Sequence, residues 1–222
     1  GSHSPAGDGG REAVEAKIKE MGGEFAFPAQ LSRNDIAAHY CPAAGDETLL
    51  EEGDIVKFDI GVHIDGHIAD GSTCVNLGDH EELAKASREA LDAAIKAVRD
   101  GAFICDVGRA IEDVAAKFGV KPVRNLCGHG LKQWVVHGSP SIPNYDNGNK
   151  TVLRAGQQIA IEPFMSLGAG MIYEEEESEV FMMVSNKSVR NMITRKVLLE
   201  IKKYHGLPLT PRWLLPVFPK TQ

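Results

Sequence analysis

The sequence predicts an α+β fold, built from separate helices and antiparallel hairpins. Segments with apolar residues at helical spacing alternate along the 222 residues with a hairpin signal at Asp65-Gly66. The nucleotide-binding patterns GxGxxG and GxxxxGK(S/T) do not occur in the sequence, so a doubly wound sheet with a phosphate-binding loop is not indicated. The length fits one domain, or one domain with an appendage.

Composition and charge argue against several classes of function. The net charge of −7 argues against a general binder of DNA or anionic membranes, because such binders carry basic surfaces. No apolar run approaches the roughly 20 residues of a membrane-spanning helix, and we expect no signal peptide. The four cysteines are scattered without a CxxC pair, which predicts neither a disulfide framework nor a zinc ribbon. We therefore expect a reduced, cytoplasmic protein without a membrane partner.

The segment 56–75 is predicted to be a β-hairpin that carries two carboxylates. Asp65-Gly66 fits a two-residue type I′ turn, which needs a positive φ at both central positions. The expected pairing places Asp59 and Asp70 on one face as diagonal neighbours about 7–8 Å apart, with Gly61 leaving room between them. Two such carboxylates repel unless a cation lies between them. The alternative is a hairpin with one solvated polar face.

Local patterns predict the elements before and after this hairpin. A helix over 11–21 is expected to end at Gly22-Gly23, and an irregular segment bracketed by Pro28 and Pro42 follows it. A helix over 79–100 is expected to bury a stripe made of Ala84, Leu91, Ala94, Ile95 and Val98. Ser87 falls in this stripe, where its hydroxyl could bond back to a carbonyl one turn earlier.

The second half of the chain is predicted from similar signals. A helix should run from an Asp106 N-cap to Phe118, and a strand from Lys121 should break at Gly128. Two further strands are expected over 158–165, with Glu162 inside, and over 179–184, after a solvated acidic loop at 174–179. A last helix should cover 189–204 and close at Gly206.

Four polar residues form an informative set only when they are taken together. Alone, each histidine is more simply a hydrogen-bonded structural residue, whereas Glu162 is harder to explain because an unpaired carboxylate on a partly buried strand is destabilising. Asp59, Asp70, His129 and Glu162 together offer oxygen ligands with one imidazole, which suits two ions of Mn, Fe, Co or Zn. Paired ions of this kind activate water for amide hydrolysis. His39 and His137 would then lie around the ions or face the substrate.

Three motifs resemble those of a known family. FDIGVHIDGHIAD at 58–70, CGHGLKQWVVHGSPSIPN at 127–144 and IAIEPF at 159–164 are similar to motifs of the type II methionine aminopeptidases, which have the pita-bread fold. FPAQLSRNDIAAHYCP at 27–42 resembles the substrate-side loop of that branch, and YHGLPLTPRWL at 204–214 resembles part of its helical insertion. The resemblance covers nearly the whole chain, from Arg11 to Trp213.

The resemblance implies a role for each candidate residue. Asp59 would hold one of two divalent ions, Asp70 would bridge both, and His129 and Glu162 would be the remaining ligands. The substrate-side residues would be His39 near the scissile amide, His137 on the substrate or tetrahedral intermediate, and Phe27 as a wall of the methionine pocket. The implied reaction removes the initiator methionine from new proteins whose second residue is small. Such substrates imply proximity to the ribosome.

The chain also departs from the family pattern. The family's fifth ligand, a bridging glutamate on a late strand, has no counterpart before Gln222, and the acidic run at 174–179 lies in the wrong context to replace it. The expected organisation is a tag scar and linker at 1–10, an incomplete catalytic domain at 11–188 and a truncated helical insertion at 189–222. A fragment, a chain completed by a second polypeptide and a natural short form all fit this pattern. For the chain alone we expect a weakly bound second ion and slow turnover.

Two other functions are compatible with the same fold. One is a non-enzymatic binding or scaffold protein that has lost its metal, but such a protein would have no reason to carry Asp59, Asp70, His129 and Glu162 together. The other is a proline-specific or creatinase-like hydrolase, which would lack the insertion resembled by 189–214. The ligand set therefore favours a metal-dependent aminopeptidase.

Overall fold

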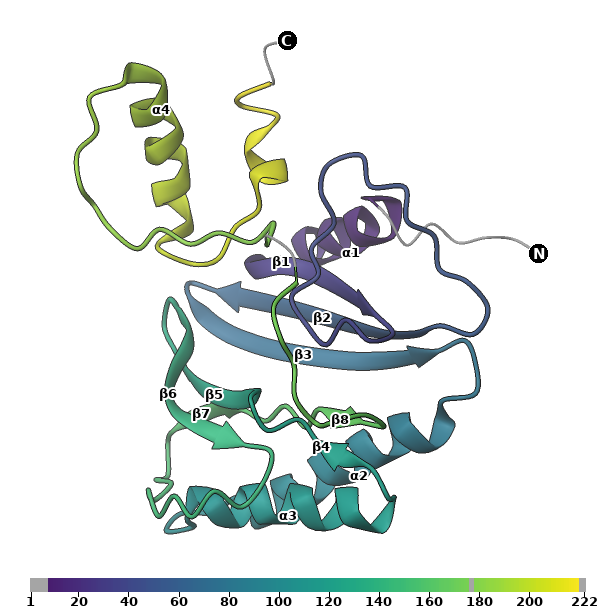
Figure 1. Ribbon diagram of the computed structural model, residues 1–222. Coiled ribbons are helices and arrows are strands. Elements are labelled where there is room, and N and C mark those ends of the chain that lie inside the picture. Colours follow the sequence, from purple (N-terminus) through teal and green to yellow (C-terminus); the bar gives the residue numbers. More distant parts are fainter. Residues whose placement is uncertain (1–7, 176–177, 220–222) are drawn as a thin grey trace. The chain divides into compact units, whose positions relative to one another are not determined.

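The computed structural model describes residues 8–175 and 178–219 (Figure 1). The chain divides into two compact units, each with its own helices and antiparallel strands. Unit 1 draws on the ranges 1–75, 133–136 and 176–222, and unit 2 draws on 76–132 and 137–175. The predicted α+β class is confirmed. Within the described ranges, no helix combines the length and the apolar character that crossing a membrane requires.

Unit 1 is built on a sheet with the strand order β1-β2-β3. Helix α1, Asp8–Glu20, contacts β1, Glu24–Arg33, which pairs antiparallel with β2, Ile55–Ile64 (Figure 1). Strand β3, His67–Asn76, follows β2 through the predicted turn. Asp65 and Gly66 have φ values of 48° and 77°, so both central residues take the positive φ of a type I′ turn and the hairpin is confirmed.

Two sequence predictions in this sheet are wrong. The segment after α1 is not irregular, because its first part forms the ten-residue strand β1. Pro28 is tolerated there because β1 is an edge strand and its register with β2 shifts between Phe27 and Gln30, the interval that contains Pro28. The predicted alternation of β2 also fails, since Ile64 is exposed whereas Gly61 and His63 are buried. Gly61 and His63 are covered by the aromatic rings of other segments of unit 1.

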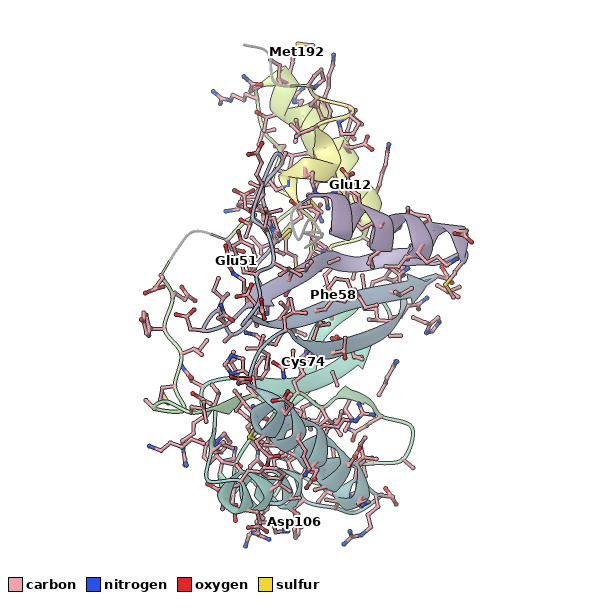
Figure 2. All side chains as sticks on the ribbon, turned by 90° about the vertical axis from the view of Figure 1, so that its right-hand side faces the viewer. Glu12, Glu51, Phe58, Cys74, Asp106 and Met192 are labelled. Atoms are coloured by element: carbon pink, nitrogen blue, oxygen red, sulfur yellow. The ribbon has the colours of Figure 1, made fainter. Side chains whose placement is uncertain are left out.

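The described C-terminal part of unit 1 contains one α-helix and two short 3-10 turns. Helix α4, Met192–Ile201, continues into the 3-10 turn η1, Lys202–Tyr204, before Gly206, so the predicted last helix is confirmed with a later start (Figure 2). The predicted strand over 179–184 is wrong, because Phe181 pairs with Leu209 only as an isolated bridge. In the acidic run, 176 and 177 lie outside the described residues, and the neighbouring Glu174 and Glu175 are exposed, as a solvated loop requires.

The turn η2, Pro211–Leu214, fastens the C-terminal segment to α1 and β1. Arg212 Nη2 lies 2.6 Å from Glu15 Oε1, and both side chains are nearly buried. The indole Nε1 of Trp213 donates to the same carboxylate at 3.3 Å. The Trp213 ring stacks between Phe25 and Tyr204, with centroid distances of 5.0 and 5.5 Å. We call these five residues the clasp; it ties the two ends of unit 1 together.

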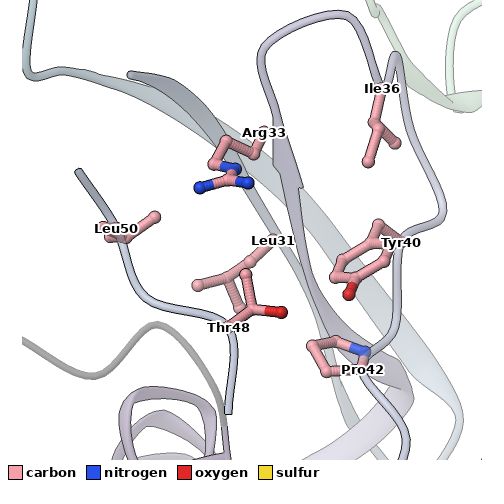
Figure 3. A pocket seen from close by; sticks show the side chains of 7 residues that line it. All are labelled: Leu31, Arg33, Ile36, Tyr40, Pro42, Thr48 and Leu50. Carbon is pink, nitrogen blue, oxygen red and sulfur yellow. The ribbon is translucent and has the colours of Figure 1, made fainter. Parts of the chain in front are cut away.

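A pocket in unit 1 lies between β1 and the loop that leads from it to β2 (Figure 3). Its walls are mostly apolar: Leu31, Ile36, Tyr40, Pro42, Thr48, Leu50 and the stem of Arg33. The Arg33 guanidinium donates to the Leu49 carbonyl at 3.1 Å and pairs with Asp54 at 3.4 Å. Burial would raise the pKa of Asp54, but hydrogen bonds from the Glu51 amide and Asn34, with the charge of Arg33, hold it below its usual range.

Unit 2 packs two helices around an aliphatic core. Helix α2 is Glu81–Ala97 and α3 is Ile104–Lys117. Their shared core consists of Ala90, Ala94, Ile104, Val107, Ile111, Val114, Ile142 and Leu153. The predicted stripe of α2 is partly wrong, because Ala86, Ala90 and Ala94 are fully buried while Ile95 is 54% exposed. The alanine row lets the helix backbones approach closely, and this tertiary requirement overrides the hydrophobicity pattern.

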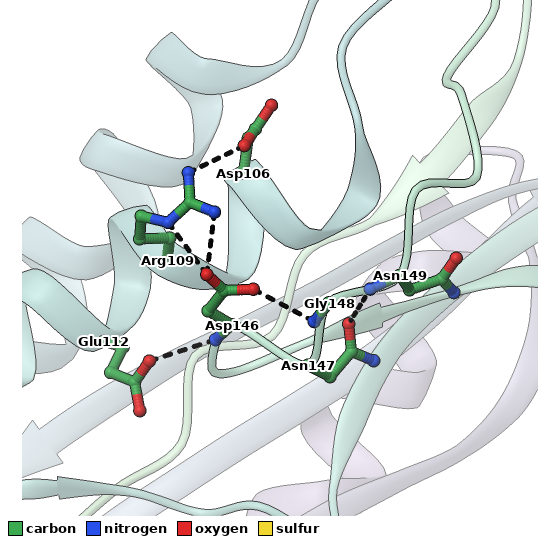
Figure 4. Close-up of polar contacts among 7 residues, drawn as sticks. All are labelled: Asp106, Arg109, Glu112, Asp146, Asn147, Gly148 and Asn149. Atoms are coloured by element: carbon green, nitrogen blue, oxygen red, sulfur yellow. Dashed lines mark hydrogen bonds and ion pairs between the residues drawn. The ribbon is translucent and has the colours of Figure 1, made fainter.

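The predicted N-cap of α3 is also wrong. The helix begins one turn earlier than expected, with Phe103 as its N-cap, so Asp106 lies in its first turn. There Asp106 accepts a hydrogen bond from Arg109 at 2.9 Å instead of capping (Figure 4). Arg109 also pairs with Asp146 at 2.7 Å, and the amide of Asp146 donates to Glu112 at 3.1 Å. These exposed contacts fix the loop after β6 against α3.

The strands of unit 2 position its polar residues. Strand β5, Cys127–Lys132, lies between β6, Val135–Pro143, and β7, Gln158–Ala160, while the short β4, Lys121–Pro122, pairs with β8, Met165–Ser166. The predicted break at Gly128 is wrong, because β5 runs through it. The predicted strand over 158–165 ends at Ala160, so Glu162 follows the strand rather than lying in it.

Candidate metal centre

His129 is held in a narrow part of the sheet of unit 2. A Cβ on Gly128 would lie 2.2 Å from the carbonyl oxygen of Ala160, and a Cβ on Gly130 would lie 2.2 Å from that of Ser139. Glycine is therefore required on both sides of His129, because the neighbouring backbones occupy the space of a side chain. His129 pairs with Ala160 in the antiparallel register and is only 7% exposed.

The His129 ring faces a carboxylate with its Nε2 atom. Nε2 lies 2.8 Å from Glu162 Oε1, and Nδ1 lies 3.3 Å from the carbonyl oxygen of Gly130. Because a carbonyl oxygen only accepts, Nδ1 is the donor in that contact, and a neutral ring then directs the Nε2 lone pair at the carboxylate. Two lone pairs at this distance need a proton or a cation between them. A histidine anchored through Nδ1 is the usual arrangement of a metal ligand.

Glu162 is placed by the turn that follows β7. The next residue, Pro163, has a carbonyl oxygen that accepts a hydrogen bond from Ser87 Oγ at 2.8 Å. This contact replaces the bond back along α2 that the sequence predicted for Ser87. Because Ser87 lies on α2, the helix fixes the turn that carries Glu162, whose side chain stays 30% exposed.

His137 lies on β6 and is exposed, with its ring edge against His129. The two ring centroids are 4.5 Å apart and the planes are inclined by 85°. Unit 2 therefore brings together three of the predicted site residues: His129, His137 and Glu162. An exposed imidazole beside a buried imidazole–carboxylate pair can exchange hydrogen bonds with a molecule bound at that pair.

The hairpin of unit 1 carries the other two predicted ligands. Asp59 on β2 and Asp70 on β3 are both half-buried. Phe27 of β1 pairs with Gly61, and a Cβ on Gly61 would lie 2.2 Å from the Phe27 ring. The ring therefore lies against the glycine, two positions along the strand from Asp59. Phe27 is only 6% exposed and forms a buried aromatic wall on this part of the sheet.

His39 lies in the loop after β1, in a left-handed backbone conformation with a φ of 66°. The backbone amide of His39 donates to Gln30 Oε1 at 3.0 Å, and His39 as a whole is exposed. Gln30 in turn pairs with Asp59 in the β1–β2 register. The sequence prediction missed Gln30, because the segment was expected to be irregular. Three of the four residues in Gln30-Leu31-Ser32-Arg33 are polar, so this stretch lacks the apolar–polar alternation that would have indicated a strand.

Comparisons with known proteins agree with this architecture. Residues 10–192 match the model of metallopeptidase family M24. The chain is 45% identical to the methionine aminopeptidase of Archaeoglobus fulgidus over 204 residues, which cover 91% of this chain and 70% of that protein. It is 46% identical to the methionine aminopeptidase of Thermococcus onnurineus over 214 residues, covering 95% of this chain and 72% of the relative.

A solved structure gives the same result for the fold. The crystal structure of a methionine aminopeptidase from Thermotoga maritima superposes with a TM-score of 0.70 at 30% identity, covering 75% of this chain and 71% of that one. The expected pita-bread fold is thereby confirmed. The family match and the relatives lead to one assignment: the chain belongs to metallopeptidase family M24, among the methionine aminopeptidases.

Proposed function

We propose that this protein removes the N-terminal methionine from peptides and newly made proteins whose second residue is small. The observation that carries the proposal is the His129–Glu162 pair, in which Nε2 and a carboxylate oxygen face each other at 2.8 Å. Because the other ring nitrogen contacts a carbonyl oxygen, the pair is oriented to hold a cation. The similarity to named methionine aminopeptidases supports the choice of substrate.

The proposed ligands are Asp59, Asp70, His129 and Glu162. Three carboxylates and one imidazole match the ligand preferences of Mn, Fe, Co and Zn, and three carboxylates are enough to neutralise most of the charge of two divalent ions. When bound, two such ions lower the pKa of a water molecule and polarise the scissile carbonyl. The half-buried setting of Asp59 and Asp70 fits this role, because two neighbouring carboxylates are stabilised by a cation.

The remaining candidates act on the substrate. His137 is exposed beside His129, where its imidazole can donate a hydrogen bond to the carbonyl oxygen of the scissile amide as that oxygen gains charge. His39 would contact the amide from the loop after β1. Phe27, held against Gly61, would pack against the apolar methionine side chain. The space around these three groups would limit the size of the second residue and so set the preference for a small one.

We also propose the domain organisation that the sequence suggested. The catalytic domain would occupy 11–188 and a helical insertion 189–222, in which α4 and η1 are the helical part. The tag scar and linker expected at 1–10 is shorter than that, because α1 already begins at Asp8. A substrate with a free N-terminal methionine is most abundant as a nascent chain, so the proposed place of action is close to the ribosome.

The test combines metal content with hydrolysis. The purified chain is loaded with Mn, Co or Zn, its bound metal is measured by mass spectrometry, and release of methionine from Met-Ala-Ser and Met-Leu-Ser peptides is compared. We expect bound metal, and cleavage of the Met-Ala peptide at least about tenfold faster than of the Met-Leu peptide, because a bulkier second residue is excluded sterically.

Two variants and a control test whether metal binding and hydrolysis depend on the proposed ligands. His129→Ala and Glu162→Gln should each lower metal affinity by about 100-fold and abolish most of the hydrolysis, because each removes a ligand. His67→Ala changes an exposed histidine that is not among the proposed ligands, and it should leave metal affinity and hydrolysis unchanged. Equal metal content in His129→Ala and in the parent chain would overturn the proposed ligand set. A chain that binds no metal and cleaves neither peptide would support a non-enzymatic binding protein instead.

A further inference from the structure

Gln30 is a buried polar side chain whose position links two of the candidate site residues. It is 5% exposed and pairs with Asp59 across the β1–β2 ladder. Its Oε1 accepts a hydrogen bond from the backbone amide of His39 at 3.0 Å. A buried amide oxygen without a donor would be strongly unfavourable, so this contact satisfies Gln30 and fixes the loop at the same time.

The backbone of His39 is in a conformation that needs such support. Its φ of 66° lies in the left-handed region, which residues with a Cβ seldom occupy. Conformations of this kind persist where several surrounding contacts hold them in place, and they are frequent at functional sites. The hydrogen bond to Gln30 therefore holds a strained residue in place.

The next residue of the loop is anchored independently. The Tyr40 carbonyl accepts from the Leu31 amide at 3.1 Å, and the Tyr40 amide donates to Ser32 Oγ at 3.3 Å. The Tyr40 ring lines the pocket together with Leu31, and its hydroxyl donates to Asp46 at 2.9 Å (Figure 3). Ser32 thus provides a contact of the same kind as Gln30, but one residue further along the loop.

We propose that Gln30 is a positioning residue that sets where His39 stands relative to Asp59, acting through the His39 backbone. The proposal rests on the proposed function, in which His39 contacts the substrate and Asp59 holds metal. In this proposal Gln30 itself would contact neither substrate nor metal. Its neighbour across the ladder is a candidate ligand and its hydrogen-bond partner is a candidate substrate contact, so one side chain links the two.

The first experiment measures the anchor without any catalysis. Gln30→Met keeps the length and apolar stem of the side chain but removes the acceptor. Amide hydrogen exchange at His39 in the metal-free chain should become about tenfold faster, because its acceptor is gone. Ser32→Ala is the matched control and should accelerate exchange at Tyr40 but not at His39. Unchanged exchange at His39 in Gln30→Met would overturn the proposal.

The second experiment separates positioning from a purely structural role. Gln30→Met should lower kcat for Met-Ala-Ser about fivefold, the size expected from the loss of one hydrogen bond, with a smaller change in KM. In a His39→Ala background the same change should have no further effect, because its target is already absent. An equal loss of kcat in both backgrounds would overturn the positioning role.

The two experiments also distinguish the possible failures. A parent chain that cleaves no methionyl peptide would overturn the proposed function, and with it the catalytic consequence of Gln30. The exchange comparison would still decide whether Gln30 anchors His39. If Gln30→Met does not fold, Gln30→Leu provides the same removal of the acceptor with a branched apolar side chain.

Discussion

The two units of this protein are stabilised in different ways. Unit 2 closes over an aliphatic core in which α2 and α3 meet through small residues, and its backbones approach too closely for a side chain at Gly128 or Gly130. Unit 1 relies instead on the clasp, in which the buried pair of Glu15 and Arg212 is covered by Trp213. The first arrangement depends on shape and the second depends on charge and hydrogen bonding. Substitutions and pH should therefore affect the two units differently.

The largest effect is expected where backbones are in contact. Gly128→Ala places a Cβ against the carbonyl of Ala160, which cannot move without separating β5 from β7. We expect a destabilisation of about 3 kcal/mol or more, measured by denaturant unfolding of the metal-free chain. Gly71→Ala is the control, because no atom lies within 4 Å of its Cβ position, and it should change stability by less than about 0.5 kcal/mol. Equal stability of the two variants would show that the strands adjust.

The second-largest loss of stability is expected in the clasp. Glu15→Gln keeps the shape of the side chain but leaves the nearly buried guanidinium of Arg212 without its counter-charge. We expect a loss of about 2 kcal/mol in the free energy of unfolding. The control is Lys17→Gln, which removes an exposed ion pair with Glu20 and should cost less than about 0.5 kcal/mol. Similar losses in both variants would mean that the clasp is no stronger than a surface pair.

A smaller effect is expected for the bond that holds the turn of Glu162. Ser87→Ala removes the hydroxyl that donates to the Pro163 carbonyl at 2.8 Å. Stability should fall by about 1 kcal/mol, and metal affinity should fall several-fold because the carboxylate is held less firmly. Calorimetric titration with Mn or Zn measures the affinity, with the exposed Ser141→Ala as control. Unchanged metal affinity would show that Glu162 does not depend on α2.

The smallest effect concerns the pH response of unit 1. The His63 ring is buried edge-on against Trp134, with a centroid distance of 4.9 Å, and its Nδ1 accepts from the Gly66 amide. Burial lowers the pKa of His63 below 6.5; Lys19 and His205 act in the same direction, while Glu24 and Asp65 oppose them. The folded state thus prefers the neutral ring.

The sign of this effect follows from linkage. Because the unfolded chain binds the proton more readily, the stability that His63 contributes is complete above about pH 6.5 and is lost as pH falls toward the folded pKa. His63→Gln, compared with the parent chain in unfolding experiments from about pH 8 to about pH 5, should flatten the stability profile. An identical slope of unfolding free energy against pH in both proteins would contradict the role of His63 in the pH response.

The parts of the fold that were predicted correctly depend on local chemistry. The turn at Asp65-Gly66 needs a positive φ at both positions whatever surrounds it, so the hairpin could be identified from two residues. The parts that were missed depend on distant partners. Pro28 argued against a strand until the irregular pairing of the edge strand β1 was known, and the buried face of α2 is set by α3 rather than by its own pattern.

The candidate site likewise has parts that the sequence predicted and parts that it did not. His129 stands between two glycines in the sequence, and the structure supplies the neighbouring backbones that lie against them. Glu162 was expected inside a strand because its neighbours are apolar, whereas the strand stops at Ala160 and a bond from Ser87 sets the turn. Gln30 could not be assigned a role from the sequence, because its importance comes from a contact with a loop residue in an unusual conformation.

The clasp has a further consequence for the order of events during synthesis. Glu15 and Trp213 are separated by 198 positions, so the contact between them can form only once Trp213 has left the ribosome. Every residue of unit 2 precedes that point, and its helices and strands pair over shorter separations. Because long-range contacts also form more slowly, unit 2 should fold first while α1 waits for its partner. Until then the parts of α1 and β1 that the clasp covers stay open, and that interval is when unit 1 is most exposed to aggregation.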